Sequence, residues 1–146
     1  MGLVYADITL MNSIDFGMSK RGALPDEKVR RKNVRALVDT GAFMLTIDEK
    51  LKNELGLDFE EQVNVELADG QQTKCDLVGP IKINFRTRTT TCMAVVLPGA
   101  TEVLLGAIPL EGMDVIIDPA RQELTLPPAR PHIAQTIVKE AMIAGY

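Results

Sequence analysis

Short stretches of alternating apolar and polar residues, separated by turn signals, limit what this chain can fold into more than any other feature of its sequence. Residues 63–67 (Val-Asn-Val-Glu-Leu) and 81–86 (Ile-Lys-Ile-Asn-Phe-Arg) alternate in this way, as half-buried strands do. Asp69 and Gly70 stand between residues 63–67 and the strand-like residues 73–78, and Asp-Gly is a strong short-range signal for a hairpin. Regular helical crossovers, which a parallel α/β fold needs, are not evident. The pattern therefore predicts an all-β domain, either a small barrel or a sandwich.

The remaining secondary structure is expected to be short strands with a few short helices. One helix is predicted over residues 48–56, because Asp48 is a candidate N-cap and Gly56 can end the helix. Residues 12–33 are largely polar and are predicted to form a long connection with one helical turn near Pro25. The other expected elements are a short helix at 108–112 and strands at 3–10, 34–38, 43–47, 90–97, 113–117 and 123–126.

The composition indicates one packed domain and argues against several classes of function. A chain of 146 residues with 46% hydrophobic residues can bury a substantial core. Its formal net charge of −4 argues against general binding of nucleic acid. Cys75, Cys92 and His132 lack the spacing of metal ligands, so we expect free cysteines, no metal and no cofactor. No apolar run reaches the length of a membrane span and no leader peptide is evident, so we expect no membrane contact and a cytoplasmic location.

The end of the chain differs in character from the rest. Residues 127–131 (Pro-Pro-Ala-Arg-Pro) break any regular structure, and from Ile133 onward apolar residues recur at helical spacing. We therefore expect a domain over residues 1–126, followed over residues 127–146 by a proline-rich linker and a C-terminal amphipathic helix. A helix this short is marginal alone, so we expect it to pack on its own barrel or on a partner subunit.

Asp39 stands in the middle of an apolar stretch, between residues 36–38 (Ala-Leu-Val) and 43–45 (Phe-Met-Leu). Burying a carboxylate without a partner is costly, so a carboxylate in such a place is expected to be held by specific contacts. Thr40 and Gly41 directly after it would let backbone N–H groups and one short side chain approach its oxygens. The same tripeptide also fits an ordinary strand end followed by a turn.

A second motif lies downstream of Asp39, at residues 103–106 (Val-Leu-Leu-Gly). Together with the Asp-Thr-Gly-Ala stretch that begins at Asp39, it resembles the retropepsin-like aspartic proteases, in which an apolar-apolar-Gly segment passes beneath the Asp-Thr-Gly-Ala loop. The resemblance spans residues 34–126 and is closer to the small cellular bacterial and archaeal members than to the viral ones. It implies a closed all-β barrel with short helices and one half of an active site per chain.

The resemblance also implies roles for individual residues. Viral members often have an acidic residue after the first motif and an arginine after the second, and here those positions hold Phe43 and Ala107, so packing is expected in place of that ion pair. The implied site has Asp39 as the catalytic residue, with Thr40, Gly41, Ala42, Leu104, Leu105 and Gly106 supporting it, and Ala68, Asp69 and Gly70 as a flap over the substrate.

The activity that the resemblance implies is hydrolysis of peptide bonds. This chemistry needs two carboxylates around one water, and two carboxylates held a few Å apart share a proton. Because the chain carries one copy of the motif, the second carboxylate must come from another copy. The sequence thus predicts an aspartic endopeptidase that acts as a homodimer on a peptide or protein substrate. An alternative stays open, which is a binding or assembly module that keeps the fold and cleaves little or nothing.

Overall fold

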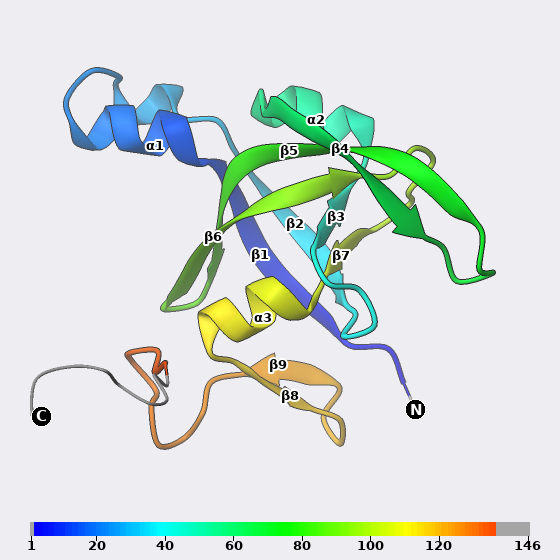
Figure 1. Cartoon of the computed structure of the whole chain (residues 1–146). Helices are drawn as coiled ribbons and strands as arrows, with labels where there is room; N and C mark the ends of the chain where they lie inside the picture. The colour runs from blue at the N-terminus through cyan, green and yellow to red at the C-terminus, as the bar shows by residue number, and fades with distance from the viewer. Residues whose placement is uncertain (1, 137–146) are drawn as a thin grey trace, which may run out of the picture.

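The computed structural model describes residues 2–136, which form a β-barrel with short helices around it (Figure 1). The strands are β1 (Tyr5–Asn12), β2 (Arg31–Val38), β3 (Leu45–Ile47), β4 (Asp58–Glu66), β5 (Gln72–Phe85), β6 (Arg88–Val96), β7 (Val103–Leu105), β8 (Ile116–Asp118) and β9 (Glu123–Thr125). The helices are α1 (Ser13–Lys20), the 3₁₀ helix η1 (Asp26–Lys28), α2 (Glu49–Leu55) and α3 (Ala107–Met113).

The barrel closes because β5 pairs with β1 in addition to its neighbours in the chain. The strands form one sheet in the order β4-β5-β6-β3-β7-β2-β1-β9-β8. The extra pairing, with Thr9 opposite Asn84 and Leu10 opposite Ile83, joins β1, β5, β6, β3, β7 and β2 into a ring. The predicted closed all-β barrel is therefore confirmed, and β4 and the β8–β9 hairpin extend the sheet beyond the ring.

The core lies inside this ring, at every second strand position. Ile8 and Leu10 of β1 and Ile81 and Ile83 of β5 are all buried, with exposed fractions of 3%, 0%, 0% and 0%. Lys82, which stands between the two isoleucines, is only half-buried. Successive side chains of a strand point to opposite faces, so the alternation in the sequence was a reliable guide to the core.

Helix α2 begins and ends where the sequence predicts. The Asp48 carboxylate accepts a hydrogen bond from the Leu51 backbone N–H at 2.8 Å, which caps the first turn. Gly56 adopts the left-handed conformation with φ of 60°, which ends the helix at little steric cost. Leu51 and Leu55 are one turn apart and both buried, so the helix packs against the barrel.

Helix α1 lies where the sequence predicts an irregular connection, and this prediction was wrong. The Asn12 side chain accepts hydrogen bonds from the backbone N–H groups of Ile14 and Asp15, both at 3.0 Å. Asp15 is the one buried residue of the helix, and the Arg30 guanidinium donates to its carboxylate at 2.8 and 3.0 Å. The helix thus docks through a charged residue and shows no apolar stripe that would predict it. The expected helical turn near Pro25 is present as η1.

Strand β5 is continuous where the sequence predicts two strands, at 73–78 and 81–86. Val78 pairs with Ala94 of β6 and Ile81 pairs with Cys92, so two residues of β5 oppose one residue of β6. The bulge accommodates Gly79 and Pro80, since proline cannot donate a ladder hydrogen bond and is tolerated at such a site. The two predicted segments are therefore halves of one bulged strand.

The chain after β9 is fastened to the end of α3. The Asp114 carboxylate accepts hydrogen bonds from Arg130 Nε and Nη2 at 2.8 and 3.0 Å and from the Gln135 backbone N–H at 2.9 Å. Arg88, which is 1% exposed, donates to the Arg130 carbonyl. Residues 133–136 are not helical, and residues 137–146 of the expected helix lie outside the described residues. The division at residue 126 stays a prediction.

Candidate active site

Asp39 lies at the end of β2, at the start of the loop that leads to β3. Val38 pairs in parallel with Leu105 of β7, and the Asp39 backbone N–H donates to the Leu105 carbonyl at 3.0 Å. The Ala42 backbone N–H donates back to the Asp39 carbonyl at 3.1 Å, which closes a tight turn over Thr40 and Gly41. We call residues 39–42 the Asp39 loop.

The Asp39 carboxylate is oriented from within the loop. The Gly41 backbone N–H donates to Asp39 Oδ1 at 2.9 Å. A Cβ on Gly41 would lie 3.2 Å from the same oxygen, so a residue without a side chain suits this close approach. Asp39 is half-buried, whereas Thr40 and Gly41 are exposed. The expectation of a buried carboxylate is therefore wrong, because β2 ends at Val38, β3 begins only at Leu45, and the segment between them lies at the surface with Phe43 exposed.

The second motif supports the Asp39 loop from below, through backbone contacts. The Ala107 backbone N–H donates to the Ala42 carbonyl at 2.8 Å, immediately after Gly106. A Cβ on Gly106 would lie 2.4 Å from the Met44 carbonyl oxygen and 2.7 Å from the Ala42 carbonyl oxygen. Gly106 is buried there, so the absence of a side chain allows the two segments to touch.

The two leucines of the second motif differ in burial. Leu105 is 0% exposed and belongs to the main core. Leu104 is only half-buried, although the sequence predicts both leucines to be buried beneath the loop. Neighbouring residues on a strand face opposite ways, so the two leucines cannot both point into the barrel. Of the two, Leu105 is the residue that packs beneath Asp39.

The predicted flap residues form the turn between β4 and β5. The Leu67 N–H donates to the Gln71 carbonyl at 2.7 Å, and the Asp69 carboxylate accepts from the Gln71 N–H at 2.9 Å. Gly70 has φ of 84°, a left-handed conformation that favours glycine. Ala68, Asp69 and Gly70 are all exposed. The turn projects away from the barrel (Figure 1), and the hydrogen bonds found for its residues within residues 2–136 stay inside the turn.

Three large apolar residues around the Asp39 loop were not part of the predicted site. Phe43 is 77% exposed, Leu3 is 64% exposed and Ile108 is 52% exposed. The Val38 N–H donates to the Val4 carbonyl at 2.8 Å, which places the chain around Leu3 beside the loop. The sequence marks Phe43 as a departure from the viral pattern but gives no sign that residue 3 lies near residue 39.

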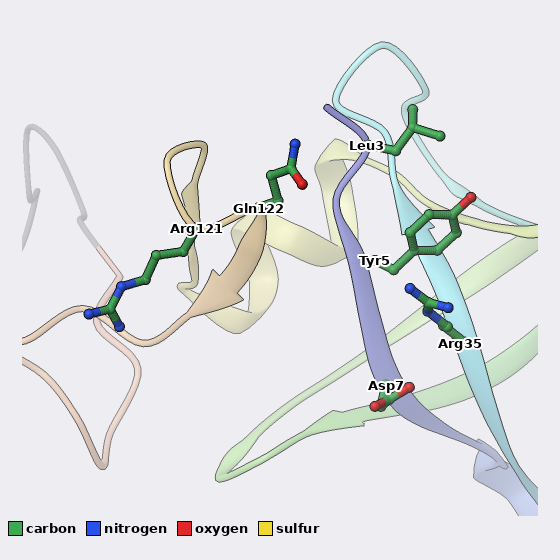
Figure 2. Close-up of a pocket in the computed structure, with 6 residues that line it drawn as sticks. All are labelled: Leu3, Tyr5, Asp7, Arg35, Arg121 and Gln122. Carbon is green, nitrogen blue, oxygen red and sulfur yellow. The ribbon is translucent and has the colours of Figure 1, made fainter. Parts of the chain in front are cut away.

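A second candidate site is the open pocket in Figure 2, whose charged side chains do not point toward a common centre. It is lined by Leu3, Tyr5, Asp7, Arg35, Arg121 and Gln122. The Arg35 guanidinium stacks 4.4 Å from the centre of the Tyr5 ring, and the Tyr5 hydroxyl donates to Glu102 at 2.7 Å, which raises the pKa of Tyr5. Arg121 points away from the other residues in Figure 2. The pocket therefore offers no converging set of groups for a ligand.

The other reactive and charged groups do not form a competing site. Burial raises the pKa of the Cys92 thiol to about 11, and burial also raises the pKa of Cys75, so neither thiol is suited to be a nucleophile. Within residues 2–136, no cluster of three or more His, Cys, Asp or Glu side chains could hold a metal ion. No helix in the described part of the chain is long and apolar enough to cross a membrane.

The basic run at residues 28–32 is held by acidic partners. Ion pairs join Arg30 to Asp15 at 2.8 Å, Arg31 to Asp26 at 3.1 Å and Lys32 to Glu54 at 2.8 Å. Since each of these three cations faces a carboxylate, the run does not present a basic surface of the kind that binds phosphates.

Comparisons with known proteins agree with the fold and the motifs. Residues 26–111 match the family model described as "gag-polyprotein putative aspartyl protease". The structure is similar to the crystal structure of the retroviral protease-like domain of Ddi1 from Leishmania major, with a TM-score of 0.54 over 88% of this chain and 90% of that chain. The two sequences are 16% identical, so the similarity concerns the fold. The sequence matches no curated protein.

Proposed function

This chain belongs to the family of retropepsin-like aspartyl proteases, and we propose that it is an aspartic endopeptidase that works as a homodimer. The observation that carries the proposal is the Asp39 loop, in which the Gly41 N–H fixes one carboxylate oxygen at 2.9 Å. The loop is exposed at Thr40 and Gly41, so it is free to meet a second copy. Its contacts with β7 and α3 keep it in one shape.

The proposed mechanism uses one Asp39 carboxylate from each copy. The two carboxylates face each other around a water and share one proton, because two like charges so close cannot both be ionised. The ionised carboxylate takes a proton from the attacking water, while the protonated one donates to the oxygen of the peptide carbonyl. We assign to the hydroxyl of Thr40, an exposed residue, a hydrogen bond to the facing loop that braces both carboxylates.

Substrate binding is assigned to the turn at residues 68–70. A hairpin that closes over an extended peptide excludes water from the reacting carbonyl and adds main-chain contacts. Gly70 lies at an exposed tip, and a Cβ added there would meet no atom within 4 Å, so the tip is not packed against the barrel. The substrate is accordingly a peptide or a protein segment in extended form.

The experiment is a digest of a peptide library by the wild-type protein and by Asp39→Asn, analysed by mass spectrometry between about pH 3 and pH 8. The amide keeps the size of the side chain and removes the ionisable group, so Asp39→Asn should fold and lose all cleavage. Asp7→Asn is the matched control, since Asp7 is an exposed acid on the barrel wall and should keep full activity. Equal cleavage by wild type and Asp39→Asn would refute the assignment. No cleavage by a wild-type dimer would instead favour a binding or assembly module.

A further inference from the structure

The exposed apolar residues at the Asp39 loop lie on two different sides of it. On one side, the chain entering β1 runs beside β2, and the Val38 N–H donates to the Val4 carbonyl at 2.8 Å, next to Leu3. On the other side, the Ile108 N–H donates to the Phe43 carbonyl at 2.8 Å, where β7 passes into α3. Figure 1 shows the loop between these two segments, the N-terminal chain and the start of α3.

Three exposed apolar side chains stand on the segments that flank the Asp39 loop, and we call them the apolar rim. Leu3, Phe43 and Ile108 are 64%, 77% and 52% exposed. Single exposed apolar residues are common on proteins, but three around a candidate catalytic group indicate a surface that is covered in the working state. Because each chain brings one Asp39, the proposed site is incomplete until a second copy meets this same surface.

We propose that a second copy covers this rim reciprocally, with Leu3 of each copy packed against Phe43 and Ile108 of the other. The inference rests on the proposed function, which requires the two Asp39 loops to face each other. A two-fold interface uses the same patch on both copies, so a residue on one side of the axis meets the residue from the opposite side. With the axis through the Asp39 loops and running between the Leu3 side and the Phe43 side, the Leu3 side of one copy lies over the Phe43 side of its partner.

Every residue of the proposed contact is apolar, and this composition predicts how the dissociation constant of the dimer responds to salt. Leu3, Phe43 and Ile108 carry no charge, so no ion pair joins the two copies at this contact. Apolar association is not weakened by screening ions, whereas an ion pair is. The dissociation constant of the dimer should therefore stay the same or fall when the salt concentration rises from about 0.1 M to about 1 M.

Disulfide cross-linking tests the reciprocal geometry directly. Leu3→Cys and Phe43→Cys are prepared as separate proteins, and each is oxidised alone and after mixing. The mixture should give a covalent dimer, because the two new thiols meet across the interface, while each variant alone should stay uncross-linked. Phe59→Cys is the matched control, because Phe59 is 58% exposed on the edge strand β4 and should give no cross-link in any mixture. The wild type serves as the oxidation blank, because it carries the two native thiols, Cys75, which is buried, and Cys92, which is half-buried.

A second measurement does not depend on disulfide chemistry. Phe43→Ser removes the aromatic ring twice per dimer, so the dissociation constant measured by light scattering or ultracentrifugation should rise at least about 100-fold. Phe59→Ser removes another exposed ring, which is 58% exposed against 77% for Phe43, and should leave the constant unchanged. Circular dichroism checks that both variants are folded.

The outcomes separate this contact from the proposed function. A wild-type dimer that cleaves peptides without cross-linking in the mixture would keep the proposed function and refute the contact. Cross-linking of either variant alone would show that the substituted residue meets its own copy across the two-fold axis, which would also refute the contact. If Phe43→Ser stayed dimeric but changed the preference for substrate side chains, the rim would bind substrate and the contact would again be wrong. A protein that is monomeric at all concentrations would overturn both.

Discussion

Replacing Gly106 by alanine tests the close contact that holds the Asp39 loop. Gly106 has φ of −86°, which any residue can adopt, so the substitution introduces no backbone strain of its own. Its effect comes from space alone, because the new Cβ would lie 2.4 Å from the Met44 carbonyl oxygen, 2.7 Å from the Ala42 carbonyl oxygen and 2.8 Å from the Met44 nitrogen. These are backbone atoms, so no side chain can rotate away to make room.

The size of the effect follows from these distances. Forcing an extra methyl group into a packed site costs about 1–3 kcal/mol, and we expect about 3 kcal/mol because three backbone atoms must move. Gly17→Ala is the matched control, since it adds the same methyl group inside α1 with no atom within 4 Å. That substitution should stabilise the protein by about 0.5–1 kcal/mol, because alanine favours the helix and restricts the unfolded chain.

The assay is equilibrium unfolding in urea, followed by far-ultraviolet circular dichroism because the chain has no tryptophan. All proteins are compared at one concentration, since association adds to apparent stability. Gly106→Ala should lower the free energy of unfolding and Gly17→Ala should raise it, with the slope on urea unchanged. The same midpoint for wild type and Gly106→Ala would show that the loop moves freely on β7, and the reasoning would then fail.

Two further predictions concern the core beneath the loop and the end of the chain. Leu105→Ala should cost about 2–5 kcal/mol in the same urea assay, whereas Leu104→Ala should cost less because that side chain is half-buried; equal losses would contradict the assignment of Leu105 to the core. The Arg130 guanidinium and the Gln135 N–H hold the pKa of Asp114 well below its usual range, so its stabilising contacts persist above the ordinary carboxyl pKa and are lost only as the pH falls through the lowered value. Amide hydrogen exchange at Gln135 should therefore be faster in Asp114→Asn than in wild type near neutral pH, with the difference vanishing in strong acid, and equal rates near neutral pH would show that Asp114 does not hold this segment.

The sequence predicted those parts of the fold that depend on local pattern. Helix α2 could be placed because Asp48 and Gly56 carry capping chemistry next to an apolar pair. Helix α1 could not, because it docks through Asp15 and Arg30, which are 15 positions apart and join only in the folded chain. The bulge at Gly79 likewise depends on the register of β6, which no local pattern encodes.

The candidate site was predictable to the extent that its parts carry motifs. The stretches that begin at Asp39 and at Val103 were identified as a pair, because together they resemble the motifs of one family. The structure brings them into contact through the Asp39 N–H and the Leu105 carbonyl. The burial of the Asp39 side chain was not predictable, because apolar neighbours in the sequence can belong to a strand that ends just before the loop. Leu3 was missed because only the pairing of β1 with β2 brings it near Asp39.

The way the Asp39 loop is fastened explains how the chain can lack the ion pair of its viral relatives. The bonds that join the loop to β7 and α3 run from backbone to backbone, at Asp39–Leu105, Ala42–Ala107 and Phe43–Ile108. Backbone hydrogen bonds do not depend on which side chains stand at positions 43 and 107, so an apolar pair there leaves the loop in place. The requirement falls instead on Gly106, where a side chain would collide with the loop backbone. The side chain at position 43 is therefore free to take part in association, while Gly106 is not free to change.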